Sequence, residues 1–289
     1  MGQPSRRRSR RIGAGVIAGA LVVGGGGFLL GRVTSPRPVH RASVAPAPVL
    51  APAPAPAPVA TPAVTPPLGR ADLLDAARQA ADAFAAARPL PSPVAALDGR
   101  RFAIAIPFGC AGPAAPDATL GWTYDEDAGA LRVFAAPARL DPAEWLGPAA
   151  DDVEAIEGFW VERPWSSLET CPARPELASA GTEHSFGLAQ FFRADQSRVG
   201  RRDGKPLVVT VVTPPDAVRP GQGLRLRLSG RVAAAPGGNG PFSCHAPGIA
   251  GGRPVCLLAA SFDTVSVENP ATGETAATWP LAGGPATAD

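Results

Sequence analysis

Two histidines in the C-terminal two thirds of the chain, His184 and His245, could act as general bases near neutral pH. His184 stands directly before Ser185, so the two residue types of a serine nucleophile and its base are adjacent. Adjacency in sequence does not by itself create that geometry, and the chain has no Gly-x-Ser-x-Gly motif. We therefore predict no catalytic residue. The alternative is an exported hydrolase whose active site involves His184.

Metal chemistry has little support in the sequence. A zinc hydrolase needs convergent histidines, and no His-Glu-x-x-His pattern occurs. The acidic groups 125–127 and 151–154 lack the alternate spacing and central glycine of a calcium loop. We predict neither a metal site nor a cofactor.

Surface recognition by aromatic and basic side chains is the better-supported chemistry. Trp160, Arg163 and Trp165 lie within the eight-residue segment Gly158–Trp165 and could form a platform for a sugar ring or a partner loop. The alternative is core packing, with Arg163 stacked on an indole.

A second candidate site is the alternating segment 223–232. Arg225, Arg227 and Arg231 fall on one face of this predicted strand, where they could bind an anionic glycan. The alternative is a solvated face whose arginines pair with acids on the neighbouring strand.

Four cysteines indicate the compartment. An even number of cysteines beyond an export segment favours two disulfides formed outside the cytosol, and the absence of a C-x-x-C motif argues against zinc or redox chemistry. Of the three pairings that four cysteines allow, we expect Cys110–Cys171 and Cys244–Cys256.

The N-terminal region must deliver these groups to that compartment. Residues 12–31 are uncharged and mostly apolar, and as a helix they would span about 30 Å, the thickness of a hydrocarbon core. Residues 1–11 form a basic tail that favours a cytoplasmic N-terminus, so we predict a single-pass inner-membrane signal anchor with the C-terminal domain in the periplasm. Gly15 and Gly19 have the spacing of a helix-dimer face.

Two other interpretations of residues 12–31 are open. The layout also fits an exported and cleaved signal, either general or twin-arginine-like, the latter because Ser9–Arg10–Arg11–Ile12 resembles that motif. The third interpretation is a buried helix of a soluble protein.

Charge is divided unevenly along the chain. Residues 1–41 carry eight arginines and no acid, whereas residues 98–289 carry sixteen basic and twenty-two acidic side chains. The C-terminal region would therefore repel a phosphate backbone, and we predict no nucleic-acid partner.

Between anchor and domain lie a linker and a helix. Residues 32–69 are predicted to be a disordered Pro/Ala-rich linker, because eleven prolines in residues 36–67 prevent helix and sheet. Residues 70–88 form a predicted amphipathic helix with Asp72 as its cap.

The remainder, 97–283, is predicted to be a mainly β, disulfide-stabilised domain followed by a flexible tail at 284–289. Short alternating or apolar runs bounded by Gly and Pro favour a sandwich or barrel, either Ig-like or OB-like. The polar stretch 193–205 leaves open whether one unit or two, 97–192 and 206–283, are present. The sequence thus favours a non-enzymatic, membrane-tethered periplasmic protein that binds or scaffolds an envelope protein or glycan.

Overall fold

The computed structural model describes residues 65–178, 184–216, 219, 221–237, 240–246, 248 and 252–281. Contacts divide the chain into Met1–Ala60 and Thr61–Asp289, and the described residues belong to the second unit. The predicted basic tail, anchor, Gly15 and Gly19, most of the linker and the C-terminal tail lie outside the described residues. Within the described ranges, no helix is both long enough and apolar enough to cross a bilayer.

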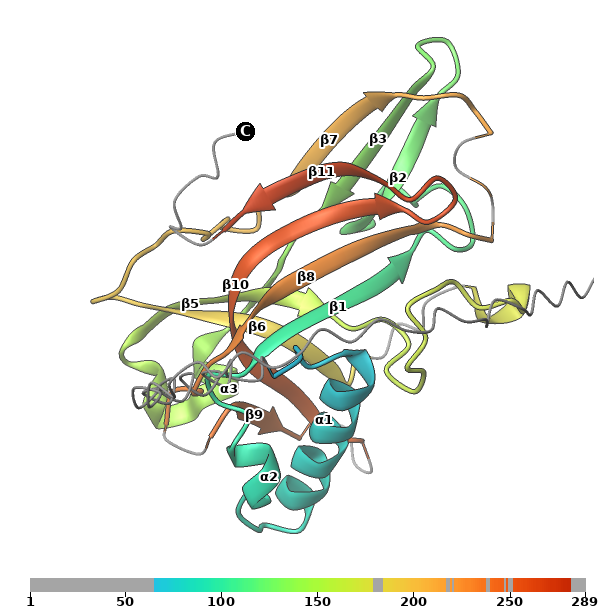
Figure 1. The fold of residues 1–289 in the computed structure, drawn as a ribbon. Helices are drawn as coiled ribbons and strands as arrows, with labels where there is room; N and C mark the ends of the chain where they lie inside the picture. Colours follow the sequence, from blue (N-terminus) through green and yellow to red (C-terminus); the bar gives the residue numbers. More distant parts are fainter. Residues whose placement is uncertain are drawn as a thin grey trace, which may run out of the picture. The chain divides into compact units, whose positions relative to one another are not determined.

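A long sheet forms most of this unit (Figure 1). Six strands follow one another across it, in the order β1 (Arg101–Phe108), β8 (Leu224–Val232), β10 (Val255–Asn269), β6 (Phe186–Arg193), β5 (Val153–Trp160) and β4 (Ala138–Leu140). Two more strands, β9 (Phe242–His245) and β11 (Glu274–Pro280), pair with opposite halves of β10. The fifteen-residue β10 is therefore the strand around which the sheet is built.

A separate three-stranded sheet has the order β2–β3–β7. Its strands are β2 (Leu120–Asp125), β3 (Ala130–Ala135) and β7 (Leu207–Val212). The hairpin predicted around 125–129 joins β2 to β3, and Asp125 accepts the N–H groups of Asp127 and Ala128 in its turn. Leu131, Val133 and Leu207 of this sheet share one buried core with residues of β1, β8 and β10, so the two sheets pack together.

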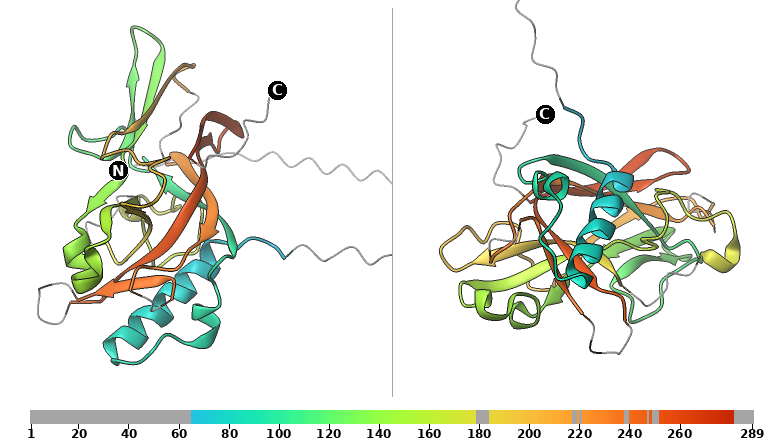
Figure 2. Two further views of the ribbon diagram at one scale, coloured as in Figure 1. Left: turned by 90° about the vertical axis from the view of Figure 1, so that its left-hand side faces the viewer. Right: turned by 90° about the horizontal axis from the view of Figure 1, so that it is seen from below.

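The helices are short apart from the first. They are α1 (Arg70–Ala85), α2 (Ser92–Ala95) and α3 (Pro142–Leu146), with single 3-10 turns at Gly147–Ala150 and Pro175–Leu177. Figure 1 shows α1 and α2 at the end of the large sheet away from β11, and the right-hand view of Figure 2 shows the two helices side by side from below. The inner face of α1 buries Leu73 and a row of alanines, because small side chains let the helix lie close to β9 and β10.

The predicted helix at 70–88 corresponds to α1, but its cap differs from the prediction. Gly69 is the N-cap, and Asp72 stands at the third helical position, where its carboxylate accepts the Gly69 N–H over 2.8 Å. Asp72 therefore ties the first turn from inside the helix.

Both predicted disulfides are confirmed. Cys110 pairs with Cys171, sixty-one residues away, and Cys244 pairs with Cys256, its direct partner between β9 and β10. The prediction of a mainly β, disulfide-stabilised fold is also confirmed. Strands from before and after residues 193–205 belong to one sheet, because β1 pairs with β8 and β6 pairs with β10.

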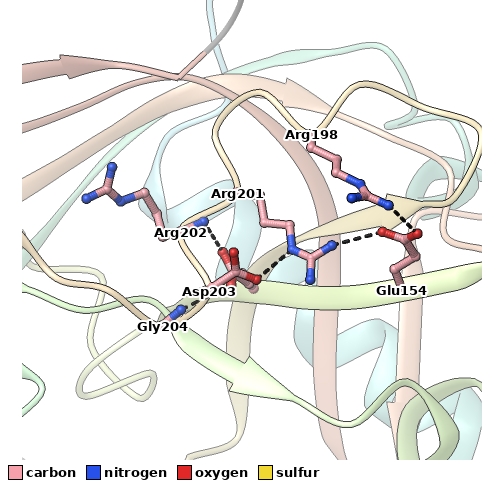
Figure 3. Close-up of polar contacts among 7 residues, drawn as sticks. Glu154, Arg198, Arg201, Arg202, Asp203 and Gly204 are labelled. Atoms are coloured by element: carbon pink, nitrogen blue, oxygen red, sulfur yellow. Dashed lines mark hydrogen bonds and ion pairs between the residues drawn. The ribbon is translucent and has the colours of Figure 1, made fainter.

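The connection from β6 to β7 is fixed to β5 by two glutamates. Glu157, 4% exposed, accepts the main-chain N–H groups of Arg202 (2.7 Å) and Gly204 (3.2 Å). Glu154 pairs with Arg198 and Arg201, the second of which also pairs with Asp203 (Figure 3). This network sets where the chain enters β7.

Candidate functional site

The most exposed tryptophan lies on a loop that is fixed from inside the protein. Trp165 is 65% exposed, and it belongs to the segment that leaves β5 and returns at β6. A large apolar ring in water gives up the favourable free energy of burial, so its exposure on a rigid support calls for an explanation.

The first support of this loop is the buried guanidinium of Arg70. It donates to the main-chain carbonyls of Glu162 (2.5 Å), Ser166 (2.9 Å) and Arg163 (3.1 Å), at 3% exposure. Burial lowers the pKa of Arg70 to about 10, and attraction to Glu169 opposes that shift. Arg70 therefore stays charged at neutral pH, and it also donates to the Ala105 carbonyl of β1 at 3.5 Å.

The second support is Arg163, which is also buried. Its guanidinium donates to the carbonyls of Pro107 (2.6 Å) and Ala178 (3.3 Å) and approaches the sulfur of Cys110 at 3.6 Å. Burial lowers the pKa of Arg163, and attraction to Glu162 opposes the shift. Burial also raises the pKa of Glu162, against the pull of both arginines.

The backbone of Arg163 is in the left-handed region, with φ of 52°. A residue with a Cβ adopts this conformation at a cost of roughly 1 kcal/mol or more, and it persists where surrounding contacts impose it. The Cys110–Cys171 disulfide closes the loop on β1, and Glu169 accepts the Ala105 N–H over 2.9 Å. Loop 161–171 is thus held at several points, and Trp165 projects from it.

A groove of about 690 Å³ runs between this loop and the outer face of α1. We call it the α1–Trp165 groove, and its apolar lining comprises Ala71, Leu74, Ala77, Ala81, Ala85, Pro164, Trp165, Phe186 and Pro254. Charged side chains also line it: Asp75, Arg78 and Asp82 on α1, and Arg253 before β10. Asp75 is already engaged by Arg78 and by Gln79 (2.6 Å), which lowers its pKa. The groove offers apolar contact bordered by charges of both signs.

The predicted aromatic cluster is divided by the structure. Trp160 lies at the end of β5, half-buried, and its indole stacks on the His184 imidazole at 4.6 Å with an angle of 6° between planes. Trp165 borders the groove, and Arg163 binds carbonyls in the interior. The three side chains therefore do not form one platform, and the guanidinium of Arg163 contacts the Pro107 and Ala178 carbonyls and the Cys110 sulfur, with no indole ring among these contacts.

The arginines predicted on β8 have acidic or main-chain partners. Arg225 and Arg227 both pair with Glu268 of β10, at 3.1 and 2.9 Å. Arg231 donates to the Gly99 carbonyl at 3.4 Å. Pairing with an acid of the neighbouring strand, which was the alternative interpretation, is confirmed for Arg225 and Arg227, and the glycan-binding role stays a prediction.

The two histidines lie in aromatic surroundings. His245 contacts Trp145 at 4.3 Å and lies 3.8 Å from Glu144. For His184 the described residues provide stacking on Trp160 and no hydrogen bond to a serine or carboxylate, and burial against its neighbours lowers its pKa. No cluster of His, Cys, Asp or Glu among the described residues could hold a metal ion.

Sequence reasoning missed Arg70 and the outer face of α1. A signal was present, because a cation in the first turn of a helix opposes the helix dipole, and Arg70 opens α1. Such a placement suggests that the side chain is used elsewhere.

Comparison with known proteins adds no relative to these observations: no family model, no curated protein and no solved structure matches the chain.

Proposed function

We propose that this chain is a membrane-tethered, non-enzymatic binding or scaffolding protein of the bacterial cell envelope. We further propose that it holds a polypeptide segment of an envelope partner in the α1–Trp165 groove. The observation that carries the proposal is the exposure of Trp165 on a loop that two buried arginines and a disulfide hold in place.

The location part of the proposal rests on the sequence and the disulfides. Residues 12–31 supply the predicted inner-membrane anchor, and two formed disulfides favour an oxidising compartment such as the periplasm. We infer a sandwich rather than a barrel for the domain, supported by the core that two separate sheets share. Its assignment to an Ig-like or OB-like class stays a prediction.

The chemistry of the groove favours a polypeptide over a glycan. Alanine, leucine and proline side chains line much of it, and sugar hydroxyl groups buried against them would lose hydrogen bonds to water. An apolar centre with a tryptophan anchor and charges at the edge is the usual composition of a protein-binding site. Because loop 161–171 is fixed before binding, little conformational entropy remains to be lost there.

The test uses a displayed library of random twelve-residue peptides panned against the full chain in detergent. We expect enrichment of peptides with apolar side chains, and Trp165→Ala should weaken their binding by about 30-fold, equivalent to roughly 2 kcal/mol. Val199→Ala is the matched control, since Val199 is 51% exposed and does not line the groove. The proposal fails if no peptide is enriched, or if enriched peptides bind Trp165→Ala as tightly as the unaltered chain.

A further inference from the structure

The strand β7 forms one edge of the three-stranded sheet. In the part of the chain that the structure describes, β7 pairs with β3 alone, and Figure 1 shows it on the outside of that sheet. The opposite edge, on β2, is partly covered, because the Ala114 N–H donates to the Trp122 carbonyl over 2.8 Å.

The register determines which backbone groups of β7 point outward. The Thr213 N–H donates to the Gly129 carbonyl over 3.0 Å, in line with the β3–β7 register. Hydrogen-bonding direction alternates along an antiparallel strand, so Leu207, Val209 and Val211 bond to β3. The N–H and C=O groups that point away from β3 are those of Val208, Thr210 and Val212, which we call the outward set.

The side chains of the outward set are also exposed and uncharged, and two of the three are valines. Val212 is 88% exposed, Val208 is 39% exposed, and Thr210 between them is exposed. Soluble proteins usually protect a sheet edge with a charge, a proline or a bulge. Within Leu207–Val212 there is no charged residue or proline, and the pairing with β3 shows no register shift.

The sequence of this strand reads the same in both directions about Thr210. It is Val208–Val209–Thr210–Val211–Val212. An interface between two identical chains related by a twofold axis must be self-complementary, and a palindromic antiparallel strand meets that requirement. With Thr210 on the axis, Thr faces Thr and every other position pairs valine with valine.

We propose that β7 pairs antiparallel with β7 of a second copy of this chain, about a twofold axis through Thr210. The outward groups then match: Thr210 faces Thr210, and Val208 faces Val212 in both directions. Each such pair exchanges two N–H···O=C bonds, and cross-strand Val–Val and Thr–Thr contacts stabilise a sheet further. The two small sheets become one continuous sheet.

Contacts at both ends of β7 fix the position of this edge strand. The Glu154 and Glu157 contacts fix the connection that enters β7 (Figure 3), and the Tyr124 hydroxyl donates to the Thr213 carbonyl over 2.9 Å at its exit. One strand pair buries less area than the roughly 1,600 Å² of a stable complex, so the dimer is expected to be reversible and dependent on concentration.

The test is a charge exchange at Thr210 in the full chain in detergent, followed by sedimentation velocity. Gly15→Leu/Gly19→Leu is present throughout to remove the helix contact predicted for residues 12–31. The parent should dimerise, and Thr210→Lys and Thr210→Glu should each weaken dimerisation at least tenfold, because like charges would face each other across the axis. Mixing the two variants should restore dimers.

The matched control is Thr123→Lys, an exposed threonine on β2, which should leave dimerisation unchanged. Circular dichroism checks that each variant is folded. A parent that stays monomeric, charge variants that associate as the parent does, or a mixture that fails to associate would overturn the proposal. Thr210→Cys gives a second readout, since facing residues of a hydrogen-bonded pair lie about 5.5 Å apart at Cα, within disulfide range.

Discussion

The guanidinium of Arg70 donates to the main-chain carbonyl of Arg163 over 3.1 Å, so one buried arginine holds the backbone of another. Arg163 in turn donates to Pro107 and Ala178. The first helix, the loop that carries Trp165 and the end of β1 are linked through these two side chains. The rigidity of the candidate site therefore originates from residues that do not face it.

Replacing Arg70 tests this support. Arg70→Ala removes a donor from four buried or part-buried main-chain carbonyls, so the free energy of unfolding in urea should fall by about 3 kcal/mol. Arg70→Lys should recover little, because an ammonium cannot reproduce the planar fork. Arg78→Ala, on the exposed side of α1, is the control and should change stability by less than about 0.5 kcal/mol. Equal stabilities of the two alanine variants would contradict the role given to Arg70.

The two disulfides should differ in their contribution to the free energy of unfolding. Cys110 and Cys171 close a loop of sixty-one residues, whereas Cys244 and Cys256 close one of twelve. In the chain-entropy model, Cys110→Ala/Cys171→Ala costs about 4 kcal/mol and Cys244→Ala/Cys256→Ala about 3 kcal/mol. Urea unfolding of both double variants measures the order, and a larger loss for the second pair would argue against this account.

Glu157 should contribute more to the stability of the fold than Glu154, which lies on the same strand. Glu157→Ala leaves the N–H groups of Arg202 and Gly204 without their buried acceptor, so we expect a loss of about 2 kcal/mol. Glu154 makes partly exposed ion pairs with Arg198 and Arg201, and Glu154→Ala should cost less than about 1 kcal/mol. Thermal unfolding of both variants decides the order, and the reverse order would show that Glu157 does not fix this connection.

The stacking of His184 on Trp160 predicts a pH effect. Burial lowers the pKa of His184, so the folded state binds its proton less readily than the unfolded chain does. Stability should then fall as the pH drops from about 6.5 through the folded-state pKa, and it should be fully present above 6.5. An NMR titration of the His184 ring, assigned with His184→Asn, should give a value below 6.5, and Trp160→Ala should raise it. A value at or above 6.5 contradicts the burial of the His184 ring.

The sequence predicted those features that depend on local pattern. Alternation along 223–232 indicated β8, and the Gly/Pro-rich segment between Cys244 and Cys256 indicated a short closed loop. Pairing of Arg225 and Arg227 with an acid on the next strand followed from the same alternation. Each of these inferences needed only neighbouring residues or the face of one strand.

The site itself depends on long-range contacts that no pattern encodes. The carbonyl acceptors of Arg70 lie more than ninety positions away in Glu162, Arg163 and Ser166. The left-handed backbone of Arg163 turns the chain between Trp160 and Trp165. Two tryptophans close in sequence therefore lie in different surroundings, Trp160 against His184 and Trp165 at the groove. The spacing of these residues predicted one aromatic platform, whereas the tertiary structure places the two tryptophans in two separate environments.

The central claim, that the α1–Trp165 groove holds a partner polypeptide, is tested most directly by photo-crosslinking in intact cells that express the full chain. A photoreactive amino acid at Ala81, in the groove, should give one discrete adduct, and the same adduct should be lost when Trp165→Ala is added. The same photoreactive residue at Thr123 on β2 is the control and should not give that adduct. The account is contradicted if Ala81 gives no adduct, if Thr123 gives the same one, or if Trp165→Ala leaves it unchanged.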